Sequence, residues 1–389
     1  MTTRSGLFPQ VGYSAAGVNQ RLSVNSPSPP LPQNPYTSYQ VLGSASWEID
    51  LWGRIRRLSE SAQASLLATD EARRGVILSL VAQTAISYIQ LRALDEQLLI
   101  AQRTLKTYEE SLRLFELQFK HGLVSQMTVE QARSQYQTAA AAIPQIANQI
   151  ALSENAISIL LGRSPSSIPR GRALAQLAMP PVPAGLPSQL LERRPDIRQA
   201  EQNLIAANAQ IGAAKALYYP TISLTGTLGL LSSALYNLFT GPSGVWSYAG
   251  SIAGPIFTAG GIKGQVIQAN AGQQAALVAY QQAIQSAFAD IEGALVTRQK
   301  LVEQLAAEER RVAAYQEYAR LAWLQYNGGY TPYLNVLYAE AQLFPAELNV
   351  VQVRATTFAA LANIYKAMGG GWVLEADKMT IQISGEKGK

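Results

Sequence analysis

Apolar residues recur three and four positions apart along two long stretches of the chain. The first seam comprises Leu98, Ala101, Leu105, Tyr108, Leu112, Phe115 and Phe119, and the second comprises Leu305, Val312, Tyr315, Ala319, Ala322 and Tyr326. Both lie in proline-free stretches, from about Arg54 to Lys120 and from about Ile262 to Asn327. A helix of that length spans about 100 Å, far more than a compact core needs, so we expect coiled-coil packing. An ordinary bundle core and a tunnel wall explain the seams about equally well.

The chain is an internal duplication. Sliding the sequence against itself by 207 residues, without gaps, brings Gly53 onto Gly260 and Gly122 onto Gly329. Each copy then has the same order: two stretches of alternating polarity, a very long helix, a tight turn and a shorter helix. We therefore predict two β-hairpins and two long helical hairpins.

Strands decide the class of protein. No charged residue occurs between Lys215 and Lys263, and prolines and glycines interrupt that stretch, which excludes a spanning helix and predicts a hairpin. In copy one, Trp47, Ile49 and Leu51 alternate with Glu48 and Asp50. An apolar face opposite two carboxylates suits a barrel with a lipid exterior and a wet lumen, so we predict Glu48 and Asp50 in the lumen. The alternative is an antiparallel sheet in a soluble protein.

Four strands cannot close a barrel, and open strand edges are not tolerated in lipid. Three copies would supply twelve strands, an even number that is usual for such barrels. We expect a homotrimer that is mostly α-helical, with a 12-stranded membrane β-barrel continued by a long α-helical barrel.

Segment boundaries follow from these patterns. The predicted segments are a first hairpin (1–53), a first helical hairpin (54–163), an equatorial segment (164–192), a tunnel helix (193–218), a second hairpin (219–261), a second helical hairpin (262–369) and an equatorial tail (370–389).

Composition excludes several kinds of function. The net charge is +5, but the basic residues are scattered rather than gathered in a stripe, which disfavours nucleic acid. The chain has no cysteine and a single histidine, His121, so we expect no metal site and no cofactor. No nucleophile–base pair or phosphate-binding loop is recognisable, so we expect no enzyme.

A signature begins at the end of the equatorial segment and continues into the predicted tunnel helix. The run from Leu190 to Glu201, which includes Arg193-Arg194-Pro195-Asp196, and the run Tyr219-Pro220-Thr221-Ile222 resemble the TolC-like outer membrane factors of RND efflux pumps, the OprM or NodT lipoprotein type. Physically, Pro195 suits the first position of a helix and Asp196 complements its dipole, so we expect no chemistry there.

The resemblance implies a trimeric conduit in the outer membrane, in contact with its lipid and extending into the periplasm. The conduit would passively conduct drugs or other small molecules delivered by an inner-membrane RND pump through a periplasmic adaptor protein. A duct for protein secretion is a rival in the same class, and a soluble coiled-coil scaffold is the rival outside it.

The resemblance also assigns roles to the turns. The family's adaptor-docking tips match Lys120, His121, Gly122, Leu123, Val124, Ser125 and Gln126, and Asn327, Gly328, Gly329, Tyr330, Thr331 and Pro332. Its pore constriction matches Tyr333, Leu334 and Tyr338, with Tyr338 standing where many relatives have an aspartate. We therefore expect closure by bulk rather than by charge.

Copy one lacks a counterpart of the helix that precedes Tyr219-Pro220, because Phe8-Pro9 lies almost at the start of the sequence. Relatives carry a signal peptide, commonly a lipid-bearing cysteine and a helix at this end. We expect the sequence to be truncated there.

Overall fold

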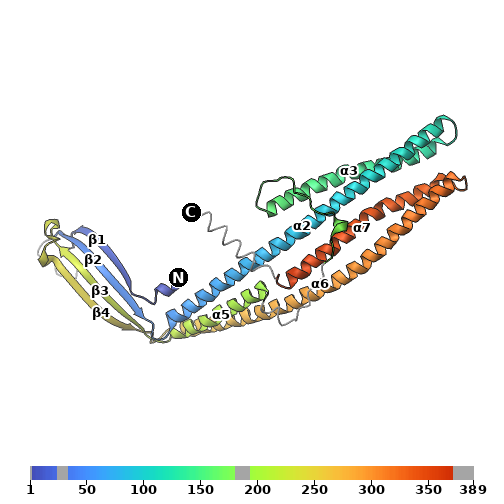
Figure 1. The fold of residues 1–389 in the computed structure, drawn as a ribbon. Coiled ribbons are helices and arrows are strands. Elements are labelled where there is room, and N and C mark those ends of the chain that lie inside the picture. Colours follow the sequence, from blue (N-terminus) through green and yellow to red (C-terminus); the bar gives the residue numbers. More distant parts are fainter. Residues whose placement is uncertain (1, 24–33, 180–192, 371–389) are drawn as a thin grey trace. The chain divides into compact units, whose positions relative to one another are not determined.

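The structure is a computed structural model that describes residues 2–23, 34–179 and 193–370 (Figure 1). The described chain runs α1 (Thr2–Ser5), β1 (Gln10–Gln20), β2 (Tyr36–Ile49), α2 (Arg54–Lys120), α3 (Gln126–Leu160), η1 (Leu174–Gln176), α5 (Pro195–Ala216), β3 (Thr221–Ser232), η2 (Leu235–Asn237), η3 (Gly241–Ser243), β4 (Gly244–Ala253), α6 (Gly261–Asn327) and α7 (Tyr333–Ala367). The predicted mixture of a sheet and very long helices is confirmed.

The duplication is visible in the bounds of the helices. α2 and α6 each have 67 residues, and α3 and α7 each have 35. Corresponding helix ends lie 207 residues apart, the offset found in the sequence. Each of the two shorter helices also contains one proline, Pro144 in α3 and Pro345 in α7. The division of the chain into seven segments stays a prediction. Residues 180–192 of the equatorial segment and residues 371–389 of the equatorial tail lie outside the described residues.

The chain divides into two compact units. The first comprises residues 1–71 and 198–283, and the second comprises residues 72–197 and 284–389.

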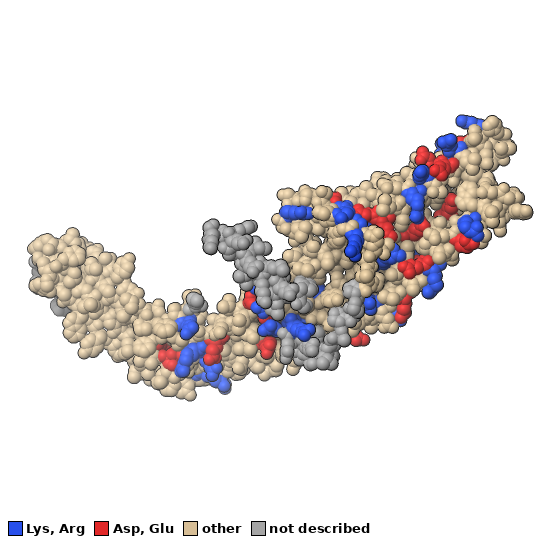
Figure 2. Space-filling view, in the orientation of Figure 1, with Lys and Arg blue, Asp and Glu red and all other residues tan. Residues whose placement is uncertain are grey.

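An antiparallel sheet in the order β1-β2-β3-β4 dominates the first unit. One face carries small hydroxyl residues in cross-strand pairs: Ser223 Oγ lies 2.7 Å from Ser251 Oγ, and Thr227 Oγ1 lies 2.7 Å from Ser247 Oγ. The other face carries Leu224, Leu228 and Trp246. Figure 2 shows no charged side chain on the visible face of the sheet, and Glu48 is the only charged residue in its strands. This alternation is the predicted pattern of one polar and one apolar face.

A glycine makes the turn between each hairpin and its long helix. Gly53 and Gly260 have φ values of 78° and 85°, in the left-handed region that residues with a Cβ rarely adopt. Next to Gly53, Trp52 stacks on Tyr219 with ring centroids 4.6 Å apart, and its Nε1 donates to the carbonyl oxygen of Pro220 at 2.7 Å. The turn of copy one is thus fastened to the start of the second hairpin.

In the described residues of the second unit, helices are the only regular secondary structure. Along α2, Leu94, Ala101, Tyr108 and Phe115 are buried at intervals of seven residues, which is the repeat of a coiled coil. Near the two helical turns, all four long helices contribute to one apolar cluster, whose buried members are Phe115, Val129, Ala132, Ala319, Ala322, Tyr333, Val336 and Ala339. The two helical hairpins therefore share a core at this end.

Candidate functional site

The first turn between helices is a glycine-dependent reversal. α2 ends at Lys120, and Gly122, with φ 68°, allows the amide of Leu123 to donate to the carbonyl oxygen of Gln118 at 2.9 Å. This is the pattern of a Schellman cap, which only glycine adopts without strain. Ser125 then caps α3 by accepting from the amide of Thr128. The side chain of Leu123 is 74% exposed, so the turn presents an apolar residue to solvent.

The second turn repeats this design 207 residues later. Gly329 has φ 75°, and the amide of Tyr330 donates to the carbonyl oxygen of Gln325 at 2.9 Å. Tyr330 is 85% exposed, and Pro332 stands at the N-cap of α7 without a side-chain cap. Each tip thus combines a rigid backbone with one large exposed apolar side chain.

The three residues predicted to constrict a pore differ in exposure. Leu334 and Tyr338 are exposed, and Tyr338 meets Tyr318 edge to face with ring centroids 6.4 Å apart. Tyr333 is only 5% exposed, and its ring lies 4.2 Å from that of Phe115. In the protomer the side chain of Tyr333 is therefore packed into the shared helical core, because α7 turns that position toward α2, and its part in a pore constriction stays a prediction.

A buried carboxyl group, that of Glu340, lies near the second tip and was not predicted from the sequence. Glu340 is 6% exposed, and its Oε1 accepts a 2.7 Å hydrogen bond from Trp323 Nε1, while Oε2 has no partner among the described residues. Burial raises the pKa of Glu340 above its usual range. The hydroxyl of Tyr108 donates to the backbone oxygen of Glu340 at 3.2 Å, and burial followed by the charge of Glu340 raises the pKa of that tyrosine. One residue thus joins α2, α6 and α7.

The duplication offered a signal for this contact. Positions 323 and 340 match Glu116 and Arg133 of copy one, which form an exposed ion pair at 3.0 Å. The same cross-helix contact is ionic and solvated in copy one, and buried in copy two.

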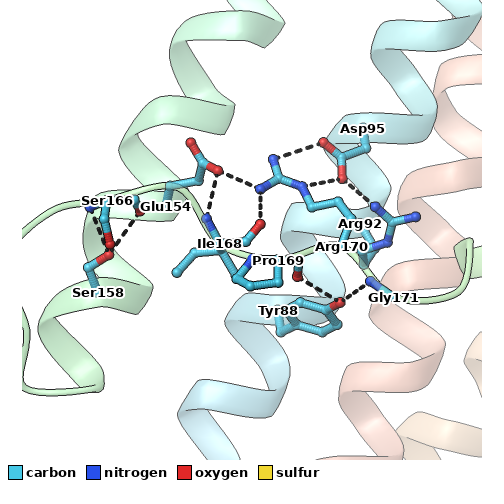
Figure 3. Close-up of polar contacts among 10 residues, drawn as sticks. All are labelled: Tyr88, Arg92, Asp95, Glu154, Ser158, Ser166, Ile168, Pro169, Arg170 and Gly171. Carbon is cyan, nitrogen blue, oxygen red and sulfur yellow. Dashed lines mark hydrogen bonds and ion pairs between the residues drawn. The ribbon is translucent and has the colours of Figure 1, made fainter.

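A clasp, residues 166–171, holds the described part of the equatorial segment (Figure 3). The guanidinium of Arg170 bonds both Asp95 on α2 and Glu154 on α3, and Glu154 also accepts from the amide of Ile168 at 3.0 Å. Hydrogen bonds from Arg170 and the amide of Ile168 lower the pKa of Glu154. Tyr88 reinforces the clasp, because its hydroxyl accepts from the amide of Gly171 at 2.8 Å. The clasp joins the middle of α2 to the end of α3.

The signature has a structural role. α5 begins at Pro195, as predicted. Arg194 is buried, pairs with Asp196 at 2.6 Å and Asp290 at 2.8 Å, and donates to the carbonyl oxygen of Ala367 at 3.1 Å. These contacts tie the start of α5 to α6 and to the end of α7. Residues 190–192 of the signature lie outside the described part of the chain.

Two carboxylates of the first hairpin have different surroundings. Glu48 lies on β2 and forms a two-point ion pair with Arg54, whose Nη2 is 2.8 Å from Oε2. Asp50 follows the end of β2, and its carboxylate accepts from the amides of Ile55 and Arg56 at 2.9 and 2.8 Å. Asp50 therefore caps α2, and the lumen position of Glu48 and Asp50 stays a prediction. Among the described residues, no three His, Cys, Asp or Glu residues group as a metal site would require.

Comparison with known proteins agrees with this architecture. A family model described as outer membrane efflux protein matches residues 1–163 and 186–370. The probable efflux pump outer membrane protein TtgC of Pseudomonas putida is 36% identical over 389 residues, covering 99% of this chain and 80% of TtgC. The cation efflux system protein CusC of Escherichia coli is 38% identical over 331 residues, covering 85% of this chain and 72% of CusC.

Solved structures give the same result. The open state of the Neisseria gonorrhoeae MtrE outer membrane channel superposes with a TM-score of 0.84 at 36% identity, covering 95% of this chain and 82% of MtrE. A crystal structure of CusC gives a TM-score of 0.85 at 34% identity, covering 95% of this chain and 85% of CusC. These neighbours are trimeric channels, and the protomer described here has a four-stranded sheet.

Proposed function

Because the chain belongs to the outer membrane efflux protein family, we propose that three copies form the outer-membrane duct of a tripartite efflux pump. A periplasmic adaptor and an inner-membrane RND pump deliver the substrate, and the duct conducts it passively to the exterior. The observation that carries this proposal is the sheet, which has two open edges and a single charged residue, Glu48, in its described strands and is joined to helices of 67 residues. In a soluble scaffold, such a sheet would expose unpaired strand edges and an apolar face to water.

Substrates are organic compounds, cations or both. Relatives are named for the efflux of toluene, antibiotics and cations, and their identities to this chain are alike, at 36% to 38%. A wide passive duct makes few contacts with its cargo, so we assign the choice of substrate to the pump. Expression with an adaptor and pump, in a strain without its own outer-membrane duct, tests this function by dye efflux. Failure of the duct to restore efflux, despite correct localisation, would contradict it.

The two tips dock the adaptor. Two features support this role: both turns are rigid, and both expose a large apolar side chain, Leu123 or Tyr330. The change of Leu123 and Tyr330 to aspartate should abolish binding to the immobilised adaptor. Leu123→Met with Tyr330→Phe is the matched control, because it keeps the apolar surface. Equal binding by both variants would refute docking at the tips.

Tyr338 and Leu334 narrow the periplasmic end of the duct. Both are exposed in the protomer, and the contact with Tyr318 holds the ring of Tyr338. Closure here relies on bulk, and Glu48 supplies the charge on the lumen face of the barrel. The change of Tyr338 to alanine should raise resting conductance in a lipid bilayer, while Tyr338→Phe should leave it unchanged. An alanine variant with parental conductance would count against the constriction.

A further inference from the structure

Glu340 is a buried ionisable group to which the proposed duct gives no role. It lies on α7, where that helix meets α2 and α6, and only 6% of it is exposed. Trp323 on α6 donates to Oε1 at 2.7 Å, and the hydroxyl of Tyr108 on α2 donates to the backbone oxygen of Glu340 at 3.2 Å. Oε2 is closed off from solvent and has no partner among the described residues. One oxygen of this carboxyl group therefore has no donor.

The cavity beside Glu340 holds no spare positive charge. Its volume is about 210 Å³, and its lining includes Arg103, Gln316 and Glu347. Among the described residues that line it, Arg103 alone is cationic, and its Nη2 lies 2.8 Å from Glu347 Oε2. Gln316 donates to Glu347 Oε1 at 3.1 Å. Both donors are thus bound to Glu347, and a negative charge on Glu340 Oε2 would be buried without compensation.

The other ionisable groups of this region are neutral or paired. Tyr108, Tyr326 and Tyr333 lie in the same packed region on α2, α6 and α7, and burial raises the pKa of each hydroxyl. The charged residues of the neighbouring turns form exposed ion pairs, which are Glu317 with Arg320 on α6, and Arg133 of α3 with both Glu130 and Glu116. A proton is therefore the ligand that fits Oε2, because it removes the charge and leaves Oε1 to accept from Trp323.

The same turns of α7 carry the proposed constriction. Tyr338 lies two residues before Glu340, about 200° around the helix, so the two side chains point from different faces. Tyr338 is exposed and meets Tyr318 of α6, whereas Glu340 is buried against Trp323 of the same helix. A movement of α7 away from α2 and α6 would therefore also move the exposed face that carries Leu334 and Tyr338.

We propose that Glu340 is a proton-binding site that sets the resting state of the duct. With a proton on Oε2, α7 stays packed against α2 and α6, and the constriction of Leu334 and Tyr338 is narrow. When Oε2 gives its proton to water, an uncompensated charge is left in the core. The helix then moves away, water reaches the carboxylate and the constriction widens. The inference rests on the proposed duct and its constriction.

The sign of the effect follows from burial. Burial raises the pKa of Glu340 in the packed state, whereas a solvated carboxyl group in the released state titrates near its ordinary value of 4.5. The packed state is therefore favoured at acidic pH, and this advantage is lost as the pH rises through the raised pKa. Resting conductance should rise with pH.

Copy one supplies an internal control for this site. At the offset of 207 residues, Arg133 and Glu116 stand where copy two has Glu340 and Trp323, and they form a solvated ion pair at 3.0 Å. No carboxylate oxygen is buried in that contact. Replacement of Arg133 should therefore leave the response to pH unchanged.

Conductance of the trimer in a planar lipid bilayer, stepped between about pH 5 and about pH 9, tests the proposal. Parental conductance should rise several-fold at the higher pH and fall again when the lower pH is restored. Glu340→Gln keeps an acceptor for Trp323 and cannot ionise, so it should stay at the low parental level throughout. Glu340→Leu is also neutral and should lose the pH dependence whatever its resting conductance. Arg133→Gln is the matched control and should respond as the parent does.

Three results would overturn the proton site. They are a parental conductance that does not change with pH, a rise that does not reverse, and a Glu340→Gln or Glu340→Leu protein that keeps the parental response, because another group would then be titrating. Alanine at both Leu334 and Tyr338 should conduct at either pH. If that variant never conducts, the proposed duct itself is contradicted, and the proton site falls with it.

Discussion

Replacement of Glu340 separates its hydrogen bond from its ionisation. Glu340→Gln keeps an oxygen that accepts from Trp323 and cannot ionise, whereas Glu340→Ala removes the acceptor. Because burial raises the pKa of Glu340 in the folded protein, folding favours the protonated form of this side chain relative to the unfolded chain. The protonated side chain of Glu340 contributes fully to stability below the unfolded-state pKa of 4.5. This contribution is lost as the pH rises through the raised pKa of Glu340 in the folded protein.

The expected magnitude follows from the contact that each variant loses. A buried donor without an acceptor costs about 1–3 kcal/mol, so Glu340→Ala should make local opening near the second tip about 5-fold to 150-fold more frequent. The matched position in copy one is Arg133, whose ion pair with Glu116 is solvated. Arg133→Ala should therefore cost about 0–1 kcal/mol, at most about 5-fold.

Amide hydrogen exchange of α6 and α7 in the trimer measures this opening. The ratio of rates between the parent and Glu340→Gln at each pH cancels the intrinsic pH dependence of exchange. We expect this ratio to be near one at acidic pH and to rise with pH as the parent opens more often. A ratio that stays flat, or a Glu340→Ala protein that exchanges like Arg133→Ala, would refute the reasoning.

Three further predictions concern the helical unit. Arg170→Ala should release the clasp and increase hydrogen exchange at the amide of Ile168. In the parent, the clasp should weaken as the pH falls through the lowered pKa of Glu154. A ratio of the exchange rates of the variant and the parent that does not change with pH would contradict this. Arg194→Ala should lower stability by about 1–3 kcal/mol in thermal unfolding, because buried carbonyl oxygens lose their charged donor, and parental stability would contradict the role of the signature. Phe115→Ala should cost about 3–5 kcal/mol in denaturant unfolding, since the side chain is fully buried, and a loss under about 1 kcal/mol would contradict a shared core at the tips.

Much of the fold could be predicted from periodicity and duplication. The first long helix runs from Arg54 to Lys120 as expected, and the second begins at Gly261, one residue before the predicted start. Helices of this length have strong local signals, since proline is absent and apolar seams continue for many turns. The residues of the tips were also recognisable, because the left-handed positions of Gly122 and Gly329 require glycine.

What could not be predicted depends on which helix faces which. Tyr333 directly follows a turn and reads as an exposed residue, yet it is buried because α2 supplies Phe115 opposite it. The sequence alone predicts a solvated, charged Glu340. In the structure Trp323 donates to its side chain and Tyr108 donates to its backbone oxygen. Asp50 continues the alternation of β2, but the strand ends at Ile49 and the carboxylate caps the next helix. In all three cases, contacts with other elements decide the surroundings of the side chain, which the local sequence pattern does not contain.

Conductance of the purified protein in a planar lipid bilayer tests the central claim most directly. A duct closed by Leu334 and Tyr338 should insert as a trimer with low resting conductance. Alanine at both positions should convert it to a steady, ion-conducting state with several-fold larger current steps. A detergent-independent monomer or dimer, or an inserted trimer that never conducts in either form, would contradict the account.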